Sequence, residues 1–402
     1  MKDVLINDEN YFSKETIERS KKEFKFTQAV HIEMLLWDFE IFSQLSAINP
    51  NKFILKGGAA TQLYLSSDKQ RASRDIDFAT TLSNKEIEEA LDKIKKKFEA
   101  HRQKDEHFEW KPVPEPKDAI IEDLYCYDIS VPTFFGSTKG KKGTTDLKID
   151  AILYKELPFK TQKLESPIVF DLKLKPFLAI TEGSLIADKM LTLADTTVGI
   201  LARREDYEAY LKQVYDLTHL TDKFLHNPGV LKDILFTLKN LTPIEIRYKH
   251  LYKKTEDVIS DIRASIEKRK YFDLDPTEAG KDLRSEIDNF QGNYLNKPEN
   301  VPSFIWALRL GKIHFIVSLI DLVINSKMTI ETFDSIISRL RESEDKLKGL
   351  KGESIKDAQN MLIKYNKDAK SAYQMRNSYL VRIFYVVINI DNYEEILTES
   401  VV

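Results

Sequence analysis

Two aspartates and two glycines in one short stretch have the types and spacing that phosphate chemistry needs. Residues 53–79 read FILKGGAATQLYLSSDKQRASRDIDFA, where Gly57 and Gly58 follow an apolar run and Asp75 and Asp77 alternate with apolar residues. Side chains at i and i+2 of a strand point to the same face, so the two carboxylates project together. Neighbouring carboxylates repel one another and stay ionised cheaply only when cations lie between them.

The paired glycines supply a second component. They carry no side chain that would keep a phosphate away from backbone N–H groups. A helix that starts directly at Gly58 would make the amides of its first turn available to an anion. Backbone amides that bind phosphate, next to a pair of carboxylates, are typical of magnesium-dependent phosphoryl or nucleotidyl transfer.

These residues resemble the nucleotidyltransferase superfamily of the DNA polymerase β type, and within it the AbiEii/AbiGii-type toxins of abortive-infection and toxin–antitoxin systems. The resemblance covers roughly the first half of the chain, and it is carried by Lys56-Gly57-Gly58, Arg71, Ser73 and Asp75-Ile76-Asp77-Phe78. It places a third carboxylate at Asp150, in the strand-like segment 147–153. It also matches two helical motifs at Lys189 and at Lys212 to Asp216, with Gln213 where the family often has Asp.

The resemblance implies an enzyme that transfers a nucleoside monophosphate from a nucleoside triphosphate to an acceptor hydroxyl. Asp75 and Asp77 would bridge two Mg²⁺ ions, with Mn²⁺ as an alternative, and Asp150 would complete the shell of one of them. The expected nucleotide-binding residues are Lys56, Gly57, Gly58, Ser73, Lys189, Lys212 and Asp216. Asp216 follows Lys212 by one helical turn, so it is expected to orient that ammonium group.

Composition bounds the class of protein. The chain has 402 residues, 42% of them hydrophobic, which suits a globular protein with a sizeable core. A net charge of −3 excludes the strong basic bias of a dedicated nucleic-acid coat protein. One cysteine, a polar N-terminal segment and the lack of an apolar run of ~20 residues predict a cytoplasmic protein without a membrane segment.

Periodicity predicts the elements that position these residues. One helix is expected at 28–45. A second is expected to begin after a capping box at Ser83 to Glu86 and to end at about residue 98. Strands are expected at 124–131 and 147–153, with a short one near 169–174. Residues 101–117 are expected to form a loop. From residue 184 onward the pattern is helical, and a capping box at Thr242 to Glu245 predicts a long helix to about Lys270.

The predicted fold class is α/β (α+β): a polymerase-β-like nucleotidyltransferase domain, with a mixed sheet flanked by helices, at residues 1–225. An all-α helical bundle domain follows at 226–402. The resemblance implies a toxin, and the partners expected from it are a nucleoside triphosphate, an RNA, tRNA or protein acceptor, and an antitoxin protein.

Two other functions remain open. A small-molecule nucleotidyltransferase of the antibiotic-modifying kind would use the same chemistry, and a nucleotide-binding scaffold would use the fold without turnover.

In the second half of the chain, residues 231–270 are rich in Lys and Arg, with Tyr248 and Tyr252 interleaved. This segment is either a shallow RNA-binding face or a solvent-exposed bundle helix.

Overall fold

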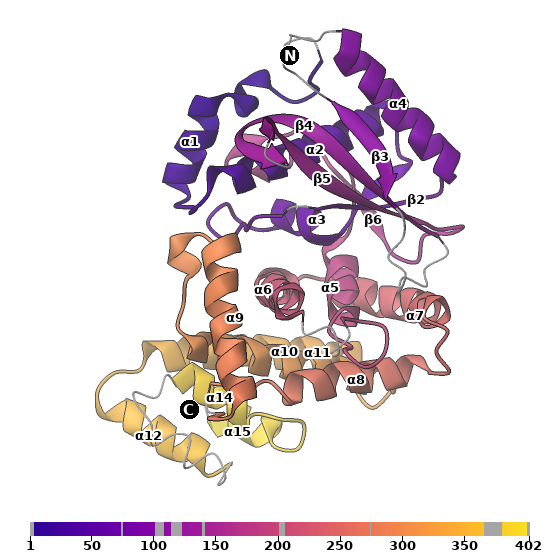
Figure 1. Cartoon of the computed structure of the whole chain (residues 1–402). Coiled ribbons are helices and arrows are strands. Elements are labelled where there is room, and N and C mark those ends of the chain that lie inside the picture. The colour runs from indigo at the N-terminus through magenta and orange to yellow at the C-terminus, as the bar shows by residue number, and fades with distance from the viewer. Residues whose placement is uncertain are drawn as a thin grey trace. The chain divides into compact units, whose positions relative to one another are not determined.

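The computed structural model describes residues 4–73, 75–100, 108–113, 123–138, 141–200, 206–273, 275–365 and 380–399 (Figure 1). Contacts within the chain divide it into two compact units. The first, called the sheet unit here, consists of residues 1–188, 247–250 and 289–300. The second, the helical unit, consists of residues 189–246, 251–288 and 301–402. The predicted domain boundary at residue 225 stays a prediction.

A mixed seven-stranded sheet organises the sheet unit, in the order β3-β4-β5-β2-β1-β9-β6. The pairs β2–β5 and β1–β9 are parallel and the other neighbours are antiparallel. The mixed α/β class is therefore confirmed, and its polymerase-β type stays a prediction. The strands are β1 (Phe53–Leu55), β2 (Asp75–Thr80), β3 (Glu109–Val113), β4 (Leu124–Thr138), β5 (Lys141–Leu153), β6 (Thr161–Leu164) and β9 (Phe177–Ile180).

Helix α2 (Ala29–Ile48) forms the centre of the core on one face of this sheet. The ring of Phe42 lies 6.3 Å from that of Phe78 on β2 and 5.2 Å from that of Phe177 on β9. Helix α2 is buried on nearly all sides, and its buried residues include the acids Glu33, Asp38 and Glu40 as well as the apolar ones. The other elements of the unit are η1 (Glu9–Phe12), α1 (Lys14–Glu23), α3 (Gly57–Tyr64), α4 (Asn84–Ala100), the two-stranded sheet of β7 (Ile168–Val169) and β8 (Leu172–Lys173), and η3 (Lys297–Glu299) (Figure 1).

The expectation of a loop at 101–117 was wrong for its middle part, because β3 forms there. Pro112 has no N–H to donate to a sheet. Since β3 is the edge strand next to β4, one of its sides needs no partner, and a proline is tolerated. The rest of that segment lies outside the described residues.

The capping box predicted at Thr242 to Glu245 was also wrong. Pro243 lies inside α7 (Val230–Tyr248), and the hydroxyl of Thr242 is buried without a hydrogen-bond partner among the described residues. Leu238, Leu241 and Ile246 are all buried. Packing of this apolar face stabilises the helix enough for it to continue past the proline. After a break, α8 (Thr255–Glu267) begins the next helix.

Helices make up the described part of the helical unit. Helix α10 (Ser303–Ile324) packs against α6, α8 and α14 and buries Trp306, Phe315 and Ile320 completely. No helix among the described residues is long and apolar enough to cross a membrane. The remaining helices, some of which cross from one unit to the other, are α5 (Glu182–Leu191), α6 (Tyr207–Phe224), α9 (Glu278–Tyr294), α11 (Ile330–Gly349), α12 (Glu353–Ile363), α14 (Leu380–Val387) and α15 (Tyr393–Glu399).

Candidate active site

The register of β2 against β5 brings the predicted carboxylates to one face of the sheet. Asp77 lies directly opposite Asp150, and Asp75 lies opposite Lys148. Ile76 is fully buried in the core on the other face, so the alternation along β2 separates the acidic side chains from the apolar ones. All three aspartates are half-buried. The structure therefore groups the three residues that the sequence predicted as metal ligands.

Gly57 closes one side of this acidic face. Its φ is +67°, and a Cβ placed on it would lie 1.9 Å from Oδ2 of Asp77. The next residue, Gly58, donates its backbone N–H to the same oxygen at 3.4 Å. Only a glycine at position 57 lets the start of α3 come this close to the carboxylate, because any side chain there would overlap it. The expected helix start at the diglycine is present. The carboxylate of Asp77 accepts a hydrogen bond from the first turn of this helix.

A buried arginine stands on the other side of Gly58. A Cβ on Gly58 would meet Oγ of Ser73 at 2.9 Å and a terminal nitrogen of Arg71 at 3.3 Å. Arg71 is 2% exposed, and its guanidinium donates to the backbone oxygen of Ala72 at 2.7 Å. A guanidinium, a hydroxyl and a helix N-terminus next to one another suit an anion such as phosphate. Arg71 belongs to the motif that carries the family resemblance, but the sequence alone predicted no role for it.

Lys148 supplies a cation to the acidic face. Its ammonium lies 2.7 Å from Oδ2 of Asp150, two residues along β5. Burial lowers the pKa of Lys148, but the hydrogen bond and charge of Asp150 outweigh burial and raise the pKa above its ordinary value. The other oxygen of Asp150, Oδ1, is buried without a hydrogen-bond partner among the described residues.

Whether these residues fit a divalent cation follows from their donor atoms. Carboxylate oxygens are the hard donors that Mg²⁺ prefers, and Oδ1 of Asp150 is a buried donor without a partner. Across the described residues, however, no three acidic, histidine or cysteine side chains are already arranged to hold a metal. In this structure Lys148 pairs with Asp150, and the N–H of Gly58 donates to Asp77. The donor set fits Mg²⁺, and Asp75, Asp77 and Asp150 would hold it.

A fourth carboxyl group lies in the core beneath this face. Asp38 on α2 is 1% exposed, and neither of its oxygens has a hydrogen-bond partner among the described residues. Burial, with the charges of Asp75 and Asp77 adding to it, raises the pKa of Asp38 well above its ordinary value. The sequence did not predict this residue, since Glu33 and Glu40 lie in the same helix and no local pattern distinguishes Asp38 from them.

Lys56, predicted to bind nucleotide, forms an ion pair inside the sheet unit. Its ammonium lies 3.0 Å from Oδ1 of Asp188 on α5, and the two side chains are only 9% and 14% exposed. Its backbone N–H donates to the carbonyl oxygen of Asp77 at 2.9 Å. Lys56 therefore ties the diglycine turn both to β2 and to α5.

The remaining predicted residues belong to the helical unit. Lys189 and Asp216 form an ion pair of 2.8 Å, and their side chains are 4% and 0% exposed. Lys212 pairs with Glu208 at 3.0 Å, one turn earlier on α6. The sequence offered Lys212 as the partner of Asp216, whereas the structure gives Asp216 the ammonium of Lys189.

We compared the chain with known protein families and with curated proteins. The family model for the nucleotidyl transferase AbiEii toxin of type IV toxin–antitoxin systems matches residues 45–309. The matched segment includes the diglycine, the three aspartates and the Lys189–Asp216 pair. No curated protein matches the chain.

Proposed function

The chain belongs to the nucleotidyl transferase AbiEii toxin family, and from this premise we propose that it transfers a nucleoside monophosphate from a nucleoside triphosphate to an acceptor hydroxyl, with pyrophosphate as the leaving group. The family makes it a nucleotidyltransferase of a type IV toxin–antitoxin system, which implies an antitoxin partner. The proposed acceptor is an RNA, a tRNA or a protein, and the proposed compartment is the cytoplasm.

One observation supports this proposal above the others: Asp77 lies opposite Asp150 on the neighbouring strand and also faces the N-terminus of α3. Carboxylates for metals and amides for phosphate thus meet at one residue. Two Mg²⁺ ions held by Asp75, Asp77 and Asp150 would lower the pKa of the acceptor hydroxyl and neutralise the leaving group.

Further residues of the chain are proposed to position the triphosphate. The amide of Gly58, the hydroxyl of Ser73 and the guanidinium of Arg71 would donate to phosphate oxygens at the start of α3. Lys189 and Lys212 would neutralise further triphosphate charge, with Asp216 holding Lys189 in place. Catalysis of this kind consists mostly of positioning and charge neutralisation.

The experiment offers each labelled nucleoside triphosphate, with Mg²⁺, to total RNA and to whole-cell protein. Asp75→Asn and Asp77→Asn are expected to lower transfer by roughly 10²-fold or more, because each removes charge that holds the metals. Asp92→Asn on α4 is the matched control, since within the described ranges its exposed carboxylate accepts only the indole N–H of Trp110.

Full transfer by either site variant would contradict the assignment of these aspartates. Triphosphate binding by the native protein without pyrophosphate release, across all acceptors, would instead favour a nucleotide-binding scaffold.

A further inference from the structure

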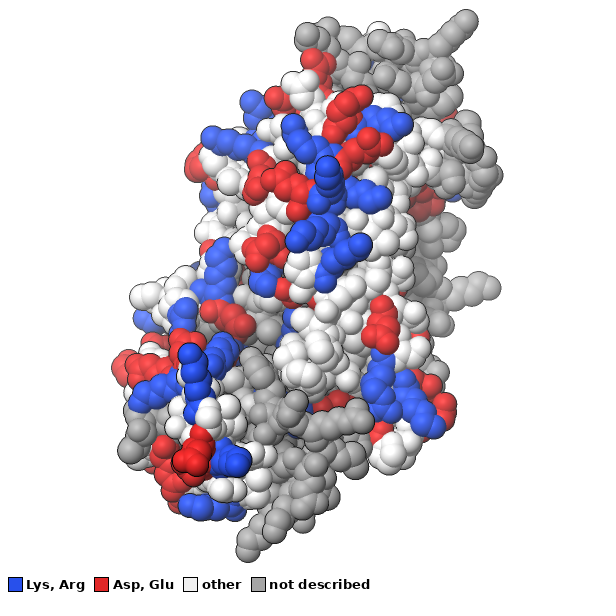
Figure 2. All heavy atoms as spheres, turned by 90° about the vertical axis from the view of Figure 1, so that its left-hand side faces the viewer, with Lys and Arg blue, Asp and Glu red and all other residues white. Residues whose placement is uncertain are grey.

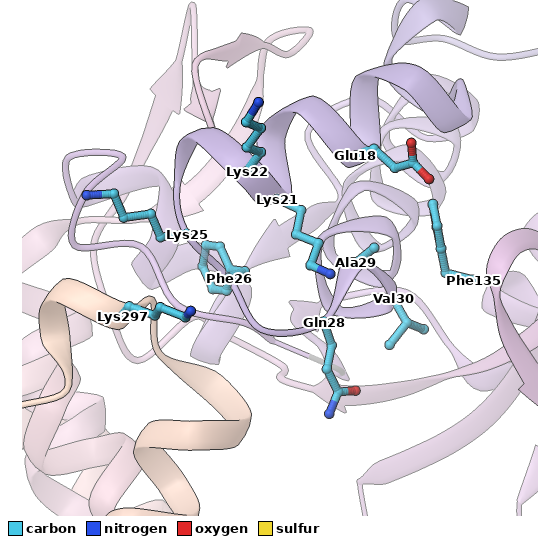
Figure 3. A pocket seen from close by; sticks show the side chains of 10 residues that line it. All are labelled: Glu18, Lys21, Lys22, Lys25, Phe26, Gln28, Ala29, Val30, Phe135 and Lys297. Atoms are coloured by element: carbon cyan, nitrogen blue, oxygen red, sulfur yellow. The ribbon is translucent and has the colours of Figure 1, made fainter.

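An open hollow of about 780 Å³ lies on the sheet unit, away from the residues of the candidate active site. It is lined by the end of α1, the segment that leads into α2, Phe135 of β4 and Lys297 of η3 (Figure 3). Lys297 comes from a distant part of the sequence, and its backbone N–H donates to the backbone oxygen of Lys25 at 3.2 Å. The two lysines are thus fixed near one another by the fold.

The charge of this hollow is one-sided. Its lining contains four lysines, Lys21, Lys22, Lys25 and Lys297, against the single carboxylate of Glu18. None of the four ammonium groups makes an ion pair within the described part of the chain, whereas Glu18 pairs with Lys14 at 4.0 Å. Figure 2 shows the face that carries α1, where basic side chains gather with acidic ones beside them. Unpaired ammonium groups around an open hollow suit a polyanion that several of them can contact together.

Figure 3 shows how these side chains lie. Lys21 extends toward Ala29 and Lys297 lies below the ring of Phe26, which is buried, while Lys22 and Lys25 point away from these residues. Lys25 has a φ of +58°, in the left-handed region that costs a non-glycine residue energy. This conformation belongs to the cap of α1, in which the N–H of Phe26 donates to the carbonyl oxygen of Lys21 at 3.1 Å.

An aromatic ring forms part of the wall. Phe135 belongs to an irregular part of β4, where the pairing with β5 is interrupted between Pro132 and Ser137. The buried carboxylate of Glu33 accepts the backbone N–H groups of Phe134 and Phe135 at 2.7 and 3.0 Å. Glu33 thereby fixes the position of Phe135 without using the strand ladder. A half-buried ring beside unpaired cations gives a base a surface on which to stack.

We propose that this hollow, named the α1 hollow, binds single-stranded RNA, with phosphates on the lysines and a base against Phe135. The exposed positions of Lys22, Lys25 and Lys297 leave it open, so a chain that runs through it fits better than an enclosed small ligand. The aromatic wall favours RNA over an acidic protein segment. The proposal rests on the proposed function in taking RNA as the acceptor, but binding is measured apart from transfer.

The helix dipole explains the positions of only some of the four lysines in the α1 hollow. Lys21 and Lys22 lie in the last turn of α1, where cations stabilise any helix. Lys25 and Lys297 lie beyond that helix, so the dipole does not explain them. In the basic segment 231–270, by comparison, Arg263 pairs with Asp321 and Lys270 with Glu267, which leaves less charge for RNA there.

The test is fluorescence anisotropy of a labelled oligouridylate over a range of KCl concentrations. The triple variant Lys21→Gln, Lys25→Gln, Lys297→Gln is expected to bind more weakly and to lower the slope of log K against log[KCl] by about 2, at about 0.7 per lost contact with a single strand. Lys85→Gln, Lys93→Gln, Lys96→Gln on α4 makes the same change of net charge in the sheet unit and should leave the slope unchanged.

Two results would overturn the proposal: a native slope in the α1-hollow triple variant, or displacement of the RNA by polyglutamate of equal charge as readily as by unlabelled RNA. The second would identify an acidic protein as the occupant. Phe135→Leu, which keeps an apolar side chain, should weaken binding by roughly tenfold without changing the slope. Asp77→Asn should bind RNA normally, so loss of transfer in that variant and loss of binding in the triple variant report on separate proposals.

Discussion

Lys148 and Asp150 form an ion pair of 2.7 Å on the face of the sheet that also carries Asp75 and Asp77. The ammonium lies against an oxygen that a metal would need, so Lys148 would compete with a divalent cation for Asp150. We therefore expect the charge on this face to be balanced either by Lys148 or by the metal.

Lys148→Met is expected to tighten Mn²⁺ or Mg²⁺ binding by up to a few-fold, because a partly exposed ion pair contributes about 0.2–1 kcal/mol. Isothermal titration calorimetry of the metal alone measures this. Lys163→Met is the control, since Lys163 pairs with Glu165 at 3.0 Å and both side chains are largely exposed. Unchanged or weaker metal binding in Lys148→Met would show that the two cations do not compete.

Gly57→Ala is expected to reduce both stability and transfer. The left-handed backbone costs an alanine about 1–2 kcal/mol, and the new Cβ would overlap the Asp77 carboxylate in addition. Gly229→Ala is a matched control with a φ of +90° and no atom within 4 Å of its Cβ, so it measures the backbone cost alone. Urea denaturation of both variants separates the two effects. Equal losses in both variants would mean that Asp77 does not require the glycine.

Lys56→Met is expected to lower the free energy of unfolding by roughly 3–5 kcal/mol, because it leaves Asp188 buried without its cation. The double variant Lys56→Met, Asp188→Leu should recover much of that loss. Lys14→Met, which removes an exposed partner of Glu18, should change stability by less than about 0.5 kcal/mol. If Lys56 acts mainly on nucleotide, its variant would instead keep its stability and lose triphosphate affinity.

Asp38→Asn is expected to stabilise the protein near neutral pH, since it removes a buried group whose charged form is disfavoured by burial and by the charges of Asp75 and Asp77. The pKa of Asp38 is raised in the folded state, so the native protein loses stability as the pH rises from the unfolded-state pKa, about 3.9, toward the folded-state pKa. The advantage of Asp38→Asn should therefore disappear below about pH 4. Denaturation of both proteins across this range, compared with Asp92→Asn, measures it. An advantage that persists in acid would mean that Asp38 is not the titrating group.

Much of the local structure around the site could be predicted because its signals are local. Alternation of polar and apolar residues predicted the strands of Asp75, Asp77 and Asp150, since side-chain direction in a strand depends only on parity along the chain. The capping box at Ser83 is present, with Glu86 accepting the Ser83 N–H at 2.8 Å. The same kind of motif failed at Pro243, because burial of the surrounding apolar face outweighed the cost of a proline in a helix.

The sequence by itself determined which chemical groups lie on one face of each strand and that a diglycine begins a helix, because these depend on neighbours a few residues away. The tertiary structure decided that β2 lies beside β5 with Asp77 opposite Asp150, that Lys56 pairs with Asp188, and that Asp38 is buried. Such relationships join residues far apart in the chain. They follow from how the whole core packs, and no short pattern encodes that packing.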